Sequence, residues 1–599
     1  MNNPGFAYLF EAKGIHPYLT DTGRLVDLVG ASDLVASLCT SSRDDMLGDV
    51  IAVIGANVTE SRRAGAAFCL HSPESDKLRR IQALWRLTVG LSCPGLSFAD
   101  TDPADTDPME GKDEAEALRS AYAAQPGLRE NTGAFLLPVG HPVSEFNRRT
   151  GRVAVTVEPK GDDPGWLDAV VDAQRRRGRS IAAEQSQDRL ARLFLPEDDD
   201  AAKVFRFPRQ FDPEEADLNN PAFPFVGADR RIAMVHADVS GLGQTFRIIT
   251  KAATSANQVM VVATLIEAAI IRAARQASVN FIVPHAAEIG ETDREKRNFA
   301  RLFNKVDPDD LPADIKILKI VPARPILLGG DDITILVRAD LAMGFVNSLL
   351  AGIERESRSA FAEIRKKFSS ETAASLPEYL SACAGVAIVS AGHPFLSANR
   401  MAEGLCKSAK KVVKSATQGG ASGPPASGVS FAVITSTIDE DYEDYRKREQ
   451  ILAQSLYGSA CPYVVGQESG GTMQSIFDLA KELANTEGRN KLIEAFALRA
   501  TDQNEALRRY VRFWKVLRSD DKTAADDKTA YERLRGLLLP FVGTAITEIC
   551  DEATPDEKDE KKKIELDRAL PVLNDAIELV DIGAVAARRA GGADDRISY

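Results

Sequence analysis

Two stretches of the chain share one order of apolar and polar positions. Residues 6–15 and 232–242 are each an apolar run that ends in an acid, Glu11 or Asp238, followed three residues later by glycine and then by a branched aliphatic residue. Such a run predicts a strand that leaves its sheet through a tight turn into a helix, because glycine tolerates the backbone conformation of the turn. We therefore expect an internal repeat of one structural unit.

Both copies then continue in one order of elements. Apolar residues at helical spacing follow the first strand, and apolar, β-branched runs with glycine between them predict a hairpin. The predicted hairpin strands cover residues 49–54 and 63–70 in the first copy, and 315–321 and 325–337 in the second. A further helix and strand are predicted at 78–89 and 151–157, and at 341–368 and 381–389 with a last helix at 397–415. This is the order of the split βαβ unit.

The repeat predicts an α+β fold of two ferredoxin-like palm domains (βαββαβ) that face each other, with a helical linker and an all-helical C-terminal domain. Helical periodicity after residue 439 supports the last part. The predicted domains are residues 1–174 for the first palm, 175–228 for a helical and Pro-rich linker, 229–438 for the second palm, and 439–599 for the helical domain.

The composition is that of a globular chain. Of 599 residues, 44% are hydrophobic and 27% are charged, which argues against a disordered or fibrous protein. The net charge of −13 disfavours a free-standing binder of duplex nucleic acid, because phosphate contact requires a basic surface. A local basic groove, or RNA held by partner subunits, stays open.

The cysteines and the apolar runs indicate the compartment. Seven widely spaced cysteines without a CxxC pair predict neither a disulfide framework nor a zinc ribbon, so a reducing cytoplasm is expected. No signal peptide pattern opens the chain. The most apolar stretch, residues 259–271, is short for a bilayer and contains Glu267. We expect a buried helix there, a cytoplasmic protein and no membrane contact.

Three acids carry the candidate chemistry. Asp331 and Asp332 lie at the tip of the second predicted hairpin, and in this fold they would face Asp238 at the end of the neighbouring strand. Such hard oxygen ligands suit Mg²⁺ or Mn²⁺, and two such ions about 3.5–4 Å apart activate an attacking hydroxyl and stabilise a leaving oxygen. The set predicts phosphoryl or nucleotidyl transfer. Asp238 and Asp331 are the first candidates as metal ligands, with Asp332 as a further ligand or an orienting carboxylate.

Small and basic residues around these acids are candidates for nucleotide binding. Glycines let backbone amides approach a triphosphate, and lysines along one helix face attract phosphate. The candidates are Ser240, Gly241, Gly243, Gly329, Gly330, Lys407, Lys410, Lys411 and Lys414. Taken alone, a GGDD sequence is more often an ordinary turn and a lysine stripe is more often a solvated helix face. Their occurrence in the order that one palm requires favours function.

The first copy serves as an internal control. Where the second copy has Gly329-Gly330-Asp331-Asp332, the first has Ala64-Gly65-Ala66-Ala67, which keeps a small turn and lacks both carboxylates. Glu11 alone cannot hold two metals, so the first palm is expected to be catalytically silent and to close the nucleotide site with its face. His236, two residues before Asp238, is expected to pack or hydrogen-bond near the site. The sequence has no P-loop and no His-Asp pair.

Three motifs resemble one known family. Asp238-Val-Ser-Gly-Leu-Gly243, Leu328-Gly-Gly-Asp-Asp-Ile333 and Ala402-Glu-Gly-Leu-Cys-Lys-Ser-Ala-Lys410 resemble the second palm of the large polymerase/cyclase subunit of type III CRISPR effector complexes, in a form without the HD nuclease domain. Glu11-Ala-Lys-Gly-Ile15 and Leu28-Val-Gly-Ala-Ser32 resemble its first palm. The resemblance covers both palms, and the helical end agrees with it only in general character.

The resemblance implies a function and assigns residues to it. It implies Mg²⁺-dependent conversion of ATP into cyclic or linear oligoadenylate second messengers in antiviral defence, with one ATP in the catalytic palm and another on the facing palm. In the family, target RNA switches this synthesis on. By position, Asp331 and Asp332 match the signature acids, Asp238 matches the strand acid, and Lys410 belongs to the phosphate-contacting helix.

Departures from the family leave alternatives open. The HD nuclease and the zinc-binding cysteines have no counterpart in the sequence, so neither DNA cleavage nor zinc is expected. The implied partners are subunits of an RNA-guided complex with guide and target RNA, and self-association stays open. A scaffold subunit with a vestigial GGDD is one alternative function, and a GGDEF-like cyclase that uses GTP is another. Product ring size and activator are not fixed by the sequence.

Overall fold

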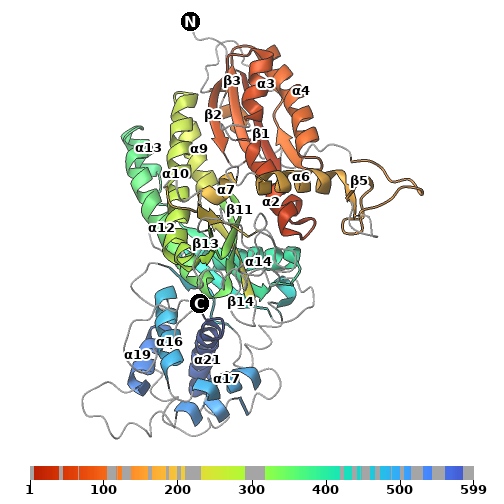
Figure 1. The fold of residues 1–599 in the computed structure, drawn as a ribbon. Coiled ribbons are helices and arrows are strands. Elements are labelled where there is room, and N and C mark those ends of the chain that lie inside the picture. Colours follow the sequence, from red (N-terminus) through yellow and green to blue (C-terminus); the bar gives the residue numbers. More distant parts are fainter. Residues whose placement is uncertain are drawn as a thin grey trace.

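The computed structural model contains two α+β halves and a helical end (Figure 1). The first half covers residues 6–183, the second half residues 231–434, and the helical end residues 472–583. The structure describes residues 6–39, 45–64, 66–103, 116–117, 119–123, 137–158, 165–183, 188–197, 204–208, 231–289, 318–417, 424–434, 442–445, 447, 459–465, 472–486, 489–498, 505–506, 508–510, 512–514, 530–542 and 560–583.

The first half is built on a four-stranded sheet, the first sheet. Its order is β2-β3-β1-β4, with β1 antiparallel to both β3 and β4. The strands are β1 (Phe6–Lys13), β2 (Thr59–Ala64), β3 (Ala67–Ser72) and β4 (Ser97–Asp100). The helices are α1 (Ile15–Thr20), α2 (Leu25–Ser37), α3 (Met46–Ile54) and α4 (Ser75–Ser92). The strand order is that of the split βαβ unit.

One strand predicted for the first half is a helix. Residues 49–54 belong to α3, because Asp45 caps this helix by accepting a hydrogen bond from Gly48 N at 2.6 Å. Gly55 ends the helix in the left-handed conformation that glycine favours. Only Val50 of the run from Asp49 to Ile54 is buried, together with Leu47 one helical turn earlier, whereas Val53 is exposed.

A second strand predicted for the first half lies elsewhere. Residues 151–157 overlap β5 (Ala154–Glu158), which pairs with β6 (Gly165–Asp168) in a separate two-stranded sheet. The fourth strand of the first sheet is β4 instead. Phe98 and Ala99 of β4 are buried, whereas every residue of β5 is exposed or half-buried. The core therefore forms around the shorter strand.

The second half repeats the same strand order in a larger sheet, the second sheet. Its order is β11-β12-β8-β13-β14-β15, and β8 is antiparallel to both β12 and β13. The strands are β8 (Arg231–Val239), β11 (Ala323–Gly329), β12 (Asp332–Arg338), β13 (Ala382–Ser390), β14 (Gly428–Val433) and β15 (Tyr463–Val464). The helices are α9 (Leu242–Ala252), α10 (Ala256–Phe281), α12 (Ala339–Arg365), α13 (Ser370–Ser375) and α14 (Phe395–Thr417).

The hairpin with the GGDD sequence consists of β11 and β12 alone. Of the predicted strand at 315–321, residues 315–317 lie outside the described residues. The rest includes β10 (Leu318–Ile320), which pairs with β7 (Phe205–Arg206) and β9 (Ala287–Ile289) in a three-stranded sheet. Pro322 separates β10 from β11, and proline cannot donate to a strand ladder. The hairpin prediction is therefore correct for residues 325–337 only.

Each half places one helix against the sheet of the other half. α10 packs on β2 of the first sheet and on α12, and α2 packs on β11 of the second sheet and on α6 (Ala169–Ala183). The Ser32 hydroxyl of α2 donates to the Ile326 carbonyl of β11. Each half thus contributes one helix to the packing of the other half's sheet. The predicted boundary between residues 174 and 175 falls inside α6, and the predicted linker contains the rest of α6, α7 (Arg189–Arg192) and β7; residues 209–230 lie outside the described residues.

α10 is an apolar helix of the core. Within the described part of the chain, the segment Ala256–His285 alone is long and apolar enough to cross a membrane by length and composition. Its Val259, Val262 and Ile266 recur at helical spacing and are almost fully buried in the cluster that also contains α12. α10 is therefore the buried helix that the sequence predicts.

The helical end packs beside the edge of the second sheet. Its helices are α16 (Met473–Asn485), α17 (Arg489–Leu498), α19 (Ala530–Val542) and α21 (Glu560–Asp581), which contact one another. Asp575 of α21 accepts hydrogen bonds from the Tyr463 hydroxyl at 2.6 Å and from Ala460 N at 2.9 Å. The short strand β15 thus comes from the region predicted to be all-helical, and it joins this region to the sheet.

Candidate functional site

The end of β8 and the β11–β12 turn bring the three predicted acids together. Asp238 lies directly opposite Asp332 in the antiparallel pairing, so both side chains emerge on the same face of the second sheet. Asp331 occupies the turn, and its carbonyl accepts a hydrogen bond from Val239 N at 2.8 Å. We call this group of three carboxylates the acid corner.

The first sheet has the same register without the same acids. Glu11 lies opposite Ala67, just as Asp238 lies opposite Asp332. In the turn before β3, Ala66 stands where the second half has an acid, and it adopts a φ of 56°. The alignment of the two hairpins derived from the sequence is therefore confirmed. Among the three equivalent positions only Glu11 is acidic.

Neighbouring charges act on each carboxylate of the acid corner differently. Lys410 of α14 donates a hydrogen bond to Asp238 Oδ2 at 2.7 Å. Burial and the negative charges of Asp332 and Asp238 raise the pKa of Asp331 above its ordinary value. A proton or a cation at Asp331 would relieve this repulsion. The crowded acids thus have the electrostatics of a cation-binding site.

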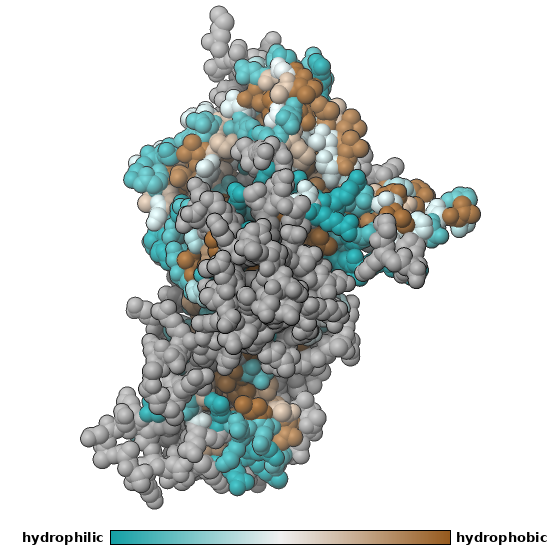
Figure 2. Space-filling model, viewed as in Figure 1, coloured by the Kyte–Doolittle hydropathy of each residue, from teal (hydrophilic) through white to brown (hydrophobic). Residues whose placement is uncertain are grey.

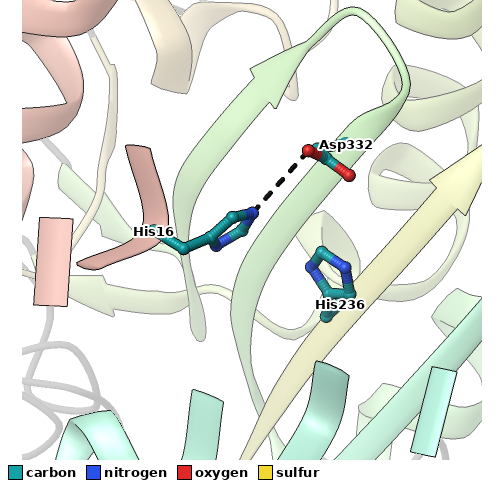
Figure 3. A group of neighbouring side chains, drawn as sticks. All are labelled: His16, His236 and Asp332. Atoms are coloured by element: carbon teal, nitrogen blue, oxygen red, sulfur yellow. Dashed lines mark ion pairs between the residues drawn. The ribbon is translucent and has the colours of Figure 1, made fainter. Parts of the chain in front are cut away.

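Two histidines lie beside Asp332, one from each half (Figure 3). His16 of α1 reaches the second half, where its Nε2 lies 3.7 Å from Asp332 Oδ2 and its ring packs edge-on against His236 with centroids 5.1 Å apart. Burial would raise the pKa of Asp332, but the contact with His16 and the nearby positive charge of Lys410 hold that pKa below its ordinary value. As expected, His236 hydrogen-bonds near the site, to Thr334 Oγ1 at 3.2 Å.

Sequence reasoning missed His16. His16 directly follows the motif Glu11-Ala-Lys-Gly-Ile15 but is not part of it, and its partner Asp332 lies far along the chain. The available signal was the repeat itself. Gly14 begins α1 with a φ of 60° and Gly241 begins α9 with a φ of 81°, so the residues after Glu11 and after Asp238 start equivalent helices. The first helix after each strand is thus a candidate for site residues.

Glycines leave room beside the acid corner. At Gly241, Gly243 and Gly330, a Cβ would meet no atom within 4 Å from described residues beyond the adjacent residues and the local helix backbone. Gly241 is also the N-cap of α9, so that the backbone N–H groups of the first helical turn begin next to Asp238. A ligand with phosphate groups therefore has both space and backbone donors here.

Ser240 and Gly329 are held within the framework of the corner. Ser240 is buried, and its N–H donates to the Ser381 carbonyl at 2.7 Å. Gly329 ends β11 and pairs with Asp332. Both residues shape the corner through the backbone.

Of the four predicted lysines, Lys410 contacts the acids. The side chain of Lys407 is 78% exposed, and its Nζ lies 3.8 Å from Glu403 Oε2. Lys411 and Lys414 are exposed along α14. The predicted lysine face therefore supplies one partner to the acid corner and three exposed charges on the same helix.

Comparison with known proteins gives low similarity. No protein-family model matches the chain, and no curated protein matches it. Among solved structures, the chain is similar to the Csm1-Csm4 cassette in complex with cA4, with 12% identity, a TM-score of 0.38 and coverage of 97% of this chain and 70% of that chain. For the Csm1-Csm4 cassette in complex with one ATP, the identity is 14% and the TM-score is 0.38, with coverage of 98% of this chain and 70% of that chain. For the Csm1-Csm4 subcomplex in the type III-A CRISPR-Csm interference complex, the identity is 12% and the TM-score is 0.38, with coverage of 97% of this chain and 70% of that chain.

Proposed function

We propose that this protein is a nucleotidyltransferase that converts ATP into cyclic or linear oligoadenylates with two divalent metal ions, in antiviral defence. One observation carries the proposal. Asp238 and Asp332 are cross-strand neighbours with Asp331 in the adjoining turn, and the equivalent corner of the first sheet has Glu11 and two alanines. Chemistry is thus assigned to one of two related sheets.

The acid corner fits Mg²⁺ or Mn²⁺ by its donor set. Both ions prefer carboxylate oxygen, and the raised pKa of Asp331, caused by burial and by the neighbouring acids, marks a place where added positive charge is favourable. Asp238, Asp331 and Asp332 would hold the ions. When bound, the ions supply activation of the attacking hydroxyl and stabilisation of the leaving oxygen.

The residues around the corner bind and orient the nucleotide in this proposal. The N–H groups that follow Gly241 lie at the start of α9 and suit the phosphates of ATP, and the space beside Gly243 and Gly330 admits them. Lys410 holds Asp238 in place through its hydrogen bond and adds positive charge. The first half closes this corner, since His16 lies against Asp332.

The partners proposed for the chain are those that the motif resemblance implies. They are subunits of an RNA-guided complex with guide and target RNA, which would supply the activating signal. The acidic net charge of −13 agrees with RNA held mainly by other subunits. The cytoplasm is the proposed compartment.

The proposal is tested by incubating the purified full chain with ATP and Mg²⁺, with and without target RNA and partner subunits, and identifying products by mass spectrometry. Wild-type protein is expected to form oligoadenylates, and the double variant Asp331→Ala with Asp332→Ala is expected to form none. Product from the double variant would sink the assignment. A double variant that assembles and protects cells like wild type would favour the scaffold alternative, and product from GTP in place of ATP would favour the GGDEF-like alternative.

A further inference from the structure

A second group of ligand-type side chains overlaps the acid corner at one residue. His16, His236 and Asp332 each offer one ligand atom, and these atoms all lie within 4.8 Å of one another (Figure 3). They come from α1 of the first half and from β8 and β12 of the second. The group therefore exists only where the two halves meet.

Both imidazole rings have an oxygen atom near Nδ1, an ion-pair contact for His16 and a hydrogen bond for His236. His16 Nδ1 lies 3.5 Å from Glu403 Oε1, and His236 Nδ1 lies 3.2 Å from Thr334 Oγ1. On His16 the Nε2 atom is left for another partner. His16 Nε2 is buried and has no hydrogen-bond partner among the described residues, although it is 3.7 Å from Asp332 Oδ2. An outer oxygen that fixes one ring nitrogen while the other is free is the usual arrangement of metal-binding histidines.

We propose that His16, His236 and Asp332 bind a divalent transition metal ion of the Zn²⁺ class in a site shared by the two halves. Imidazole nitrogen suits Zn²⁺ and Co²⁺, whereas Mg²⁺ prefers oxygen ligands. A tetrahedral ion with ligands at about 2.0–2.2 Å holds them about 3.3 Å apart, so small side-chain rotations close the group around an ion. Three protein ligands leave a fourth position open.

This site differs from the zinc site whose absence was expected from the sequence. That expectation considered cysteine ligands, and the ligands here are two histidines and one carboxylate. A bound Zn²⁺ would hold α1 against β12, and it would occupy the carboxylate of Asp332 as a ligand. Only the further consequence, that Zn²⁺ competes with Mg²⁺ for Asp332 and inhibits synthesis, rests on the proposed function.

Metal binding is measured on the full chain without nucleotide, by equilibrium dialysis against Zn²⁺ and by the visible absorption of added Co²⁺. Wild type is expected to bind one ion at this site with a tetrahedral Co²⁺ spectrum. The variants His16→Gln and His236→Gln are expected to lose that ion and spectrum, and the exposed-site control His141→Gln to keep both. Asp331→Asn is expected to keep both as well, since Asp331 is outside the group.

A second variant covers the case in which the histidine variants fold poorly. Glu403→Gln leaves all three ligands in place and weakens the support of His16, so a drop in Zn²⁺ affinity of about 10- to 100-fold is expected, with an unchanged circular dichroism spectrum. No bound ion in the wild type, or equal binding by wild type and all variants, would overturn the site. Because no ATP is present, these results stand whether or not oligoadenylates are formed.

Discussion

The two sheets share a strand order but differ on the face that carries the acid corner. In the second sheet this face bears His236, Asp238 and Asp332, and in the first sheet the equivalent positions are Leu9, Glu11 and Ala67. The side chains of Asp238 and Asp332 are 28% and 38% exposed, whereas Leu9 and Ala67 are 2% and 0% exposed. The two acids of the second sheet stay partly accessible, whereas Leu9 and Ala67 of the first sheet are buried.

The difference is explained by what covers each face. Leu9 and Cys69 of the first sheet belong to the same apolar cluster as the buried residues of α10, a helix of the second half that packs on β2. Glu11 is the remaining acid, and its Oε2 lies 2.5 Å from Nζ of Lys13 on the same strand. One copy of a duplicated unit thus serves as a packing surface, and the other keeps an open polar corner.

The largest expected effect concerns the buried face of the first sheet. Leu9→Ala should lower the free energy of unfolding by about 2–5 kcal/mol, because it removes buried apolar contact and leaves a cavity between β1 and the core. Urea denaturation measures this. The same substitution at Leu91 of α4, which is 82% exposed, should change the free energy by no more than about 0.5 kcal/mol. Equal effects at both positions would refute the assigned packing role.

The next effect concerns acid stability of the same face. Burial lowers the pKa of His71, on β3, to about 4, while an unfolded histidine titrates near 6.5. Between these values the unfolded state binds more protons, so the free energy of unfolding should fall as pH drops from 6.5 towards 4. From pH 7 to 4.5, wild type should lose about 2–3 kcal/mol more than His71→Gln.

Denaturation at several pH values measures the His71 effect. His141→Gln provides the control, because His141 is exposed and its replacement should leave the wild-type pH dependence in place. A His71→Gln variant with the same pH dependence as wild type would show that His71 is not kept neutral by burial in the first sheet.

A smaller effect is expected at the lysine that supports the acid corner. Lys410→Met should reduce oligoadenylate synthesis by about 10- to 100-fold, because the residue holds Asp238 through a 2.7 Å hydrogen bond. Lys411→Met is the matched control on the same helix, where the side chain is exposed. Initial rates at saturating ATP separate the two variants. Equal losses would mean that general positive charge on α14, and not contact with Asp238, is what matters.

Much of the fold was predictable where local signals are strong. The glycines after Glu11 and Asp238, the GGDD turn and the long apolar pattern of α10 each fix local geometry, and each was predicted. Residues 49–54 were predicted wrongly because β-branched runs suit either a strand or a buried helix face. The capping signals of Asp45 and Gly55 would have decided for the helix.

The candidate site was predictable only in part. Asp238, Asp331 and Asp332 follow from strand ends and a turn, which are short-range features. The contact between His16 and Asp332 arises from the packing of one half on the other; the repeat marks the helix of His16 as a candidate, but it does not report which residue of the other half this helix meets. The same holds for Lys410, whose position among four similar lysines is decided by where α14 crosses β8.

The central claim is that nucleotidyl transfer takes place in one half only, and a matched pair of substitutions tests it most directly. Oligoadenylate formation from ATP and Mg²⁺ is measured for Asp238→Asn and for Glu11→Gln, the equivalent strand acids of the two halves. We predict that Asp238→Asn lowers the rate by at least about 100- to 1,000-fold, while Glu11→Gln retains most of it. Equal losses in both variants, or wild-type synthesis by Asp238→Asn, would contradict the account.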